Sequence, residues 1–158
     1  MANTQSMCTS FMGELMTATH NFGTAPTRGT SAADAFKAAL YLTSATVNAA
    51  TTAYSASNEV SGTGYTAGGV AVTIANPPTA TNSSATAGVA FFTPSASITY
   101  TTVTLSTAFD AVLIYNSTQS NKAVSVHTFG SQTITAGTFT LTMPADTTST
   151  ALLRLSTT

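Results

Sequence analysis

Two histidines, one cysteine and five acidic residues are the side chains of this chain that could bind a metal or carry a proton. A protein metal site needs three or four such ligands, commonly at short spacings such as i and i+4. His20 and His127 lie far apart, and the acids are scattered at Glu14, Asp34, Glu59, Asp110 and Asp146. We therefore expect no metal site and no cofactor, with His127 packed on a strand and His20 at a helix end.

Nucleophilic catalysis has no sequence signature either. The 18 serines offer many positions for a Ser–His–Asp arrangement, but no G-x-S-x-G motif marks one of them. A lone cysteine near the N-terminus, Cys8, is more typical of a structural role. The glycine-rich segment 61–69 lacks the Lys–Ser/Thr ending of a phosphate-binding loop, so we interpret it as a tight loop anchored by Tyr65. We predict no catalytic residues and no enzymatic activity.

The scarcity of charge excludes several further classes of protein. The chain of 158 residues has four Lys and Arg against five Asp and Glu, so 6% of it is charged, compared with about 25% in a typical domain. Four scattered cations cannot neutralise the phosphates of a nucleic acid, nor hold the chain on an anionic membrane surface. No run approaches the ~20 apolar residues of a membrane span, and the first residues do not form a signal peptide. We expect synthesis in the cytoplasm.

Small hydroxyl side chains take the place of the missing charges. Thr and Ser number 35 and 18, which is 53 of the 158 residues. A neutral, hydroxyl-rich surface offers little repulsion against self-association and suits a protein packed against neighbours. The alternative is a β-rich domain whose Thr content reflects strand propensity alone.

The best helix signal covers residues 10–22, with Ser10 as N-cap, Glu14 in the first turn, and Gly23 as the stop. A helix this short must pack against something else. Its apolar stripe is either a core face or a contact surface for a partner, and we take it as the candidate interface. The stripe consists of Phe11, Met12, Leu15, Met16 and Phe22.

The rest of the chain is typical of short β-strands separated by polar turns. Segment 46–58 is expected to be a loop with a turn of helix, and 111–129 a hairpin with its turn at 116–121. Strands are expected at 36–42, where the alanines also permit a helix, and at 70–74, 89–93, 98–105, 111–115, 123–129, 132–135, 138–143 and 152–155. This pattern predicts a mainly β fold, a single-domain antiparallel β-sandwich or jelly roll with one short N-terminal helix. The domain is expected to span 1–158, with an N-terminal arm at 1–24 and a β-rich body at 34–158.

Several segments, taken together, resemble a family of small virion structural proteins of tailed bacteriophages, in order and over nearly the whole chain. They are Cys8–Phe11 with Glu14–Leu15 and Asn21–Phe22, Ala35–Tyr41, Glu59–Gly69, Ala111–Asn116, Lys122–Val124 and Leu152–Leu155. The resemblance rests on structural motifs and includes no catalytic signature. It implies a place in the virion, either on the head or in the tail.

From the resemblance and the composition we expect a capsid decoration or cement protein on the capsid surface of the virion. Its partners would be the major capsid protein and further copies of itself, in a homo-oligomer, with no nucleic acid and no membrane. Such a protein needs no reaction, because it acts by burying surface between coat subunits. The alternatives are a tail, neck or fibre component, including a receptor-binding module, and a cellular enzyme or lectin.

Overall fold

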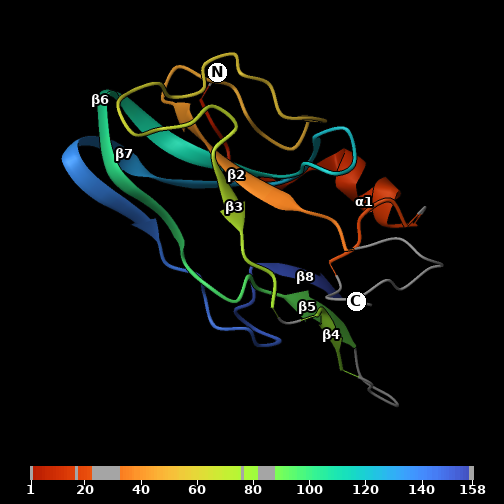
Figure 1. Ribbon diagram of the computed structural model, residues 1–158. Helices are drawn as coiled ribbons and strands as arrows, with labels where there is room; N and C mark the ends of the chain where they lie inside the picture. The colour runs from red at the N-terminus through yellow and green to blue at the C-terminus, as the bar shows by residue number, and fades with distance from the viewer. Residues whose placement is uncertain (1, 17, 23–32, 76, 82–87, 157–158) are drawn as a thin grey trace.

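The computed structural model describes residues 2–16, 18–22, 33–75, 77–81 and 88–156. It has two antiparallel sheets and one short helix, which confirms the predicted mainly β fold and is consistent with a β-sandwich (Figure 1). The larger sheet has the strand order β1 (Ser6–Met7), β7 (Lys122–Leu141), β6 (Ile98–Asn116), β2 (Phe36–Leu42), β3 (Val70–Val72). The smaller sheet has the order β4 (Thr79–Ala80), β5 (Val89–Phe92), β8 (Leu153–Ser156).

Strands β6 and β7 form one long hairpin, 19 and 20 residues in length. The sequence predicts this region as five shorter strands, because Thr, Ser and Gly interrupt the apolar pattern. In the structure the breaks on either side of the hairpin turn are β-bulges within continuous strands, and left-handed Ala136 (φ 47°) lies at one of them. A further bulge, at left-handed Thr102 (φ 54°), lies inside the predicted strand 98–105. The turn of the hairpin lies where the polar cluster predicts it, between Asn116 and Lys122.

Side chains on a strand alternate between the two faces of its sheet. In the larger sheet, aromatic side chains from other parts of the chain pack on both faces. On one face Phe36, at the start of β2, stacks on Phe22 from the N-terminal segment, with ring centroids 4.4 Å apart. On the other face Tyr115 of β6 stacks at 4.7 Å on Tyr54, which belongs to the long connection 43–69. That connection consists of turns and isolated bridges, so the helical turn predicted within 46–58 is wrong.

The glycine-rich loop is held by a buried carboxylate. Glu59 is only 9% exposed, and its side chain accepts hydrogen bonds from the hydroxyls of Tyr54 (2.6 Å) and Tyr65 (2.7 Å) and from the backbone N–H of Gly68 (2.8 Å). The Tyr65 hydroxyl also accepts a hydrogen bond from the Leu40 N–H at 3.0 Å. The prediction of a Tyr65-anchored loop is therefore confirmed, and Glu59 is the group that orients the anchor.

The hydroxyls of the other three tyrosines donate to backbone carbonyls instead: Tyr41 to Ser55, Tyr100 to Ala38 and Tyr115 to Gly68. Gly69 closes the loop against β2 at a left-handed φ of 72°. A Cβ at Gly69 would lie 1.7 Å from the carbonyl oxygen of Ala38, so this position requires glycine.

Helix α1 (Thr9–Met16) is shorter than the predicted 10–22. It ends in two hydrogen bonds of a Schellman motif, from Ala18 N–H to Leu15 and from Thr19 N–H to Glu14, with Ala18 left-handed at φ 51°. Because the helix begins at Thr9, Glu14 is not in its first turn, and the predicted interaction of that carboxylate with the helix dipole is wrong. Strands β1 and β4 have two residues each and no pattern long enough to predict them.

Candidate functional site

The predicted interface residues do not share one environment. The rings of Phe11 and Phe22 are buried, 2% and 9% exposed, and contact each other edge to face at 5.8 Å. Leu15 is partly buried and packs against the same core. The side chains of Met12 and Met16 lie outside the described part of the structure. Phe11 and Phe22 therefore belong to the core, which is the first of the two alternatives given for the apolar stripe.

An apolar groove of about 90 Å³ lies between α1 and the small sheet, and three of the five predicted interface residues line it. Its lining consists of Met7, Phe11, Leu15, Phe22, Pro78, Ala90, Phe91, Phe92, Leu153 and Leu155. Phe22 joins its two sides, since its ring contacts Phe11 and also Phe92 of β5, the latter with ring centroids 5.1 Å apart. Leu155 is 43% exposed, and no other large apolar side chain in the described ranges is classed as exposed. The groove is thus a small apolar surface with an exposed leucine at one side.

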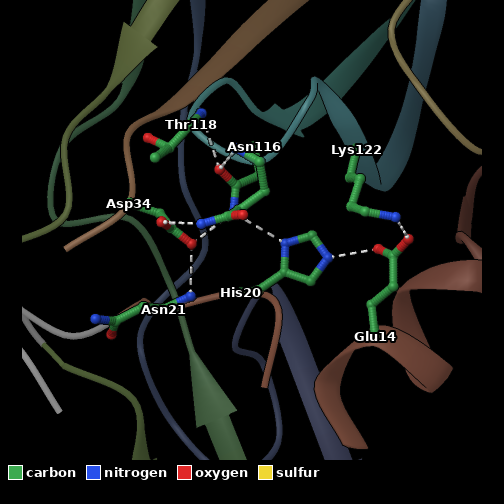
Figure 2. A network of polar contacts seen from close by, with 8 residues as sticks. Glu14, His20, Asn21, Asp34, Asn116, Thr118 and Lys122 are labelled. Carbon is green, nitrogen blue, oxygen red and sulfur yellow. Dashed lines mark hydrogen bonds and ion pairs between the residues drawn. The ribbon is translucent and has the colours of Figure 1, made fainter. Parts of the chain in front are cut away.

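A network of polar contacts holds α1 against the hairpin (Figure 2). The carboxylate of Glu14 accepts hydrogen bonds from His20 Nε2 at 2.6 Å and from Lys122 Nζ at 2.5 Å. Burial alone would raise the pKa of Glu14, but the hydrogen bonds and charges of Lys122 and His20 outweigh it and lower that pKa. His20 is buried, and its Nδ1 accepts a hydrogen bond from Asn116 Nδ2 at 3.1 Å.

Asn116, fully buried at the end of β6, continues the network to the chain that precedes β2. Its Nδ2 also donates to Asp34 Oδ2 at 2.8 Å, and the same carboxylate oxygen accepts the backbone N–H of Asn21 at 2.8 Å. Its Oδ1 accepts the N–H groups of Thr118 and Gln119, both at 3.1 Å. A buried polar network in which each member has partners fixes geometry. This one ties residues 14–21 to the hairpin turn, and so fixes one wall of the groove.

The network does not assemble a nucleophile. Both ring nitrogens of His20 are occupied by Glu14 and Asn116. Cys8 is fully buried, and burial, together with the negative charge of Glu14, raises the pKa of its thiol to about 11. A thiol with that pKa stays protonated at neutral pH, so Cys8 is a packed side chain.

A Ser–His pair does occur elsewhere, on strand β7. The Ser125 hydroxyl lies 2.9 Å from His127 Nε2, and burial lowers the pKa of His127 to about 4. Within the described residues His127 hydrogen-bonds to Ser125 alone, so no carboxylate orients the ring as in a catalytic triad. Sequence reasoning missed this pair because a spacing of i and i+2 on a strand carries no motif.

Ser125 and His127 line a cavity of about 480 Å³, between the larger sheet and the C-terminal segment. Its lining consists of Gln5, Ser6, Met7, Ser125, Val126, His127, Pro144, Thr150, Ala151, Leu152, Leu153 and Arg154. Arg154 is the charged member of this set. Three distant parts of the chain build the cavity, which is why no local pattern predicts it.

Within the described ranges, no three His, Cys, Asp or Glu side chains gather closely enough to hold a metal ion. The same residues include no helix with the length and hydropathy needed to cross a bilayer.

Comparison of the chain with protein-family models, with curated proteins and with solved structures found no match.

Proposed function

We propose that this chain is a bacteriophage virion structural protein, and that it decorates the capsid by burying surface between subunits of the major capsid protein. The observation that carries the proposal is the apolar groove beside exposed Leu155, in a chain with 6% charged residues. A surface with so few ions binds by burial of apolar and hydroxyl groups, because it has little charge with which to form ion pairs.

The groove is suited to receive one or two apolar side chains of a coat subunit. Phe11 and Phe22 line it as buried rings, and the Glu14–His20–Lys122 contacts fix the helix beside it. A preformed site loses little conformational entropy on binding. A stable contact buries on the order of 1,000 Å² or more, so the groove would be the centre of a larger, hydroxyl-rich interface. Repetition over a symmetric shell strengthens each weak contact.

Replacement of Leu155 by Asp tests this proposal, because Leu155 is exposed at the groove and its loss should leave the core intact. We expect Leu155→Asp to lower the affinity for purified heads at least tenfold, measured by co-sedimentation, with an unchanged circular dichroism spectrum. The matched control is Thr148→Asp, at another exposed position that does not line the groove. Equal binding of both variants would exclude the groove, and failure of the wild-type chain to bind heads would exclude the function.

The second candidate is a tail, neck or fibre component that binds a receptor. The cavity of about 480 Å³ favours it, because this volume lies within the range of small-ligand sites and Ser125, His127 and Arg154 offer hydrogen-bonding groups. Counting copies per virion separates the two candidates. On the order of hundreds of copies indicates the shell, and about a dozen or fewer indicates the tail.

A further inference from the structure

Beyond His127, the outer edge of β7 has no partner strand among the described residues. Strand β1 covers only the start of this edge, where Ser6 and Met7 pair with Val126 and Ser125. From Thr128 to Leu141, no backbone group hydrogen-bonds to a described residue outside the β6–β7 hairpin. In Figure 1 this part of the hairpin lies at the side of the sheet away from β2 and β3. We call Thr128–Leu141 the β7 edge.

The β7 edge lacks two devices that keep exposed strands from pairing. Charged residues and proline are common on such strands, and neither type occurs between Thr128 and Leu141. Bulges interrupt its pairing with β6 before Gln132 and at Ala136. From Leu141 to Phe139 the pairing runs without a shift, since these residues face Ile98, Thr99 and Tyr100. The next shift, between Phe139 and Gly137, places the extra residue on β6, at left-handed Thr102, so β7 itself has no bulge from Gly137 to Leu141. The regular end, Gly137–Leu141, has the length of an ordinary strand.

The two faces of Gly137–Leu141 differ in a way that selects a partner. Thr138 and Thr140 are exposed, while Phe139 is half-buried on Phe109, with ring centroids 5.1 Å apart. An identical strand, antiparallel and centred on Phe139, places Thr138 opposite Thr140 of the second copy and keeps apolar residues opposite apolar ones. Opposed threonines stabilise a strand pair through hydrogen bonds between their hydroxyls, and no like charges oppose each other in this register.

We propose that a second copy of this chain pairs with Gly137–Leu141 of the β7 edge, antiparallel about a twofold axis at Phe139, and extends the larger sheet across the two subunits. This inference takes up the homo-oligomer that the sequence predicts and names its surface, and it goes beyond the capsid attachment of the proposed function. A strand pair of this length buries less than a standard interface of about 1,600 Å², so it is weak in dilute solution. It gains strength when many copies are held on one surface.

Thiol crosslinking tests the register of the pair. Thr138→Cys and Thr140→Cys are prepared as separate proteins, mixed at high concentration, and oxidised in air with copper phenanthroline, so that two thiols join as a disulfide only at short range. Directly opposed residues in a strand pair have Cβ atoms about 5 Å apart, so the mixture should give a crosslinked dimer in several-fold higher yield than either protein alone. Cys8 stays in place because it is fully buried.

The matched control is the mixture of Thr99→Cys and Thr101→Cys, which are exposed on β6, one strand further in. This mixture should give no more dimer than the wild-type chain. A yield from Thr138→Cys with Thr140→Cys no higher than that of the control overturns the proposal.

Lysine substitution gives an independent readout. The double variant Thr138→Lys/Thr140→Lys places like charges directly opposite each other in the pair and should abolish association in sedimentation velocity at high concentration. The corresponding variant Thr99→Lys/Thr101→Lys should associate like the wild type. Association unchanged by lysines at 138 and 140 would contradict the proposal. Both experiments use isolated protein, so a dimer that never binds a phage head disproves the function and leaves this pairing intact.

Discussion

At the scale of single residues, Glu59 is a buried carboxylate that holds together one loop of the structure. Its carboxylate accepts two phenol hydroxyls and one backbone N–H, and these three donors come from different parts of segment 43–69. The Gly68 N–H is buried, and the hydroxyls of Tyr54 and Tyr65 are partly buried. Removing the acceptor therefore leaves several polar groups without a partner, which costs more than the loss of a single hydrogen bond.

We expect Glu59→Ala to lower the free energy of unfolding by about 3 kcal/mol, because three donors lose their acceptor. Glu59→Gln should cost about 1 kcal/mol, since its amide oxygen still accepts and its N–H can donate to the Tyr54 hydroxyl. Urea denaturation measures both. Asp146→Ala, at an exposed acid, is the control and should change stability by less than about 0.5 kcal/mol. Equal losses in the free energy of unfolding for Glu59→Ala and Glu59→Gln would show that the side-chain acceptor at this position does not stabilise the fold.

His127 makes stability depend on pH. Burial lowers its pKa from 6.5 to about 4, so between these values the unfolded chain binds more protons than the folded one. The contribution is fully present above pH 6.5 and is lost as the pH falls toward 4. Between pH 7.5 and pH 5 we expect a loss of about 2 kcal/mol in the free energy of unfolding, by urea denaturation. His127→Gln should lack this loss, and the same pH slope in the variant would contradict the assignment.

At the scale of elements, the end of α1 carries a local strain. Ala18 occupies the left-handed position that normally favours glycine, with φ at 51°. We expect Ala18→Gly to stabilise the protein by about 0.5–1 kcal/mol, seen as a rise in Tm, because glycine adopts this conformation without a steric cost. Ala50→Gly, in a turn without a left-handed φ, is the comparison and should not raise Tm. A fall in Tm for Ala18→Gly would show that backbone entropy outweighs the strain.

Element positions were largely predictable, and element lengths were not. The alternation in 36–42 and the apolar run 111–115 are local signals, and both lie in strands of the structure. The bulges that join five predicted strands into β6 and β7 depend on pairing across the hairpin, which no single segment encodes. The apolar periodicity predicts a helix that continues to Phe22, but α1 ends at Met16. The residues that follow leave the helix, and His20 then contacts Glu14, which local periodicity does not encode.

The candidate site was predictable only in part, for the same reason. Helical spacing predicts a stripe of five residues, of which three line the groove and two, Met12 and Met16, have side chains outside the described part of the structure. The three are Phe11, Leu15 and Phe22. Phe91 and Leu155 complete the groove from strands far along the chain, and their own patterns do not connect them to the helix. Glu14 and His20 looked like separate helix residues, yet they belong to one network with Lys122. Contacts of this kind depend on tertiary structure and not on local spacing.

At the scale of the whole molecule, the low charge determines how the proposed attachment should respond to salt. Ion pairs between exposed groups weaken as salt screens them, whereas apolar burial does not. With nine charged residues in the chain, we expect the protein to stay bound to capsids in 1 M NaCl, measured by co-sedimentation after a salt wash. Release near 0.5 M NaCl would mean that electrostatics dominates the contact.

The tyrosine arrangement around Glu59 also gives the molecule an optical property. All five phenols have a raised pKa, chiefly through burial, and the chain has no tryptophan to mask their absorbance. In alkali the folded protein should therefore withhold the phenolate spectrum until the polypeptide opens, and then release it in one steep step. The ultraviolet spectrum thus serves as a label-free indicator of whether a subunit is intact.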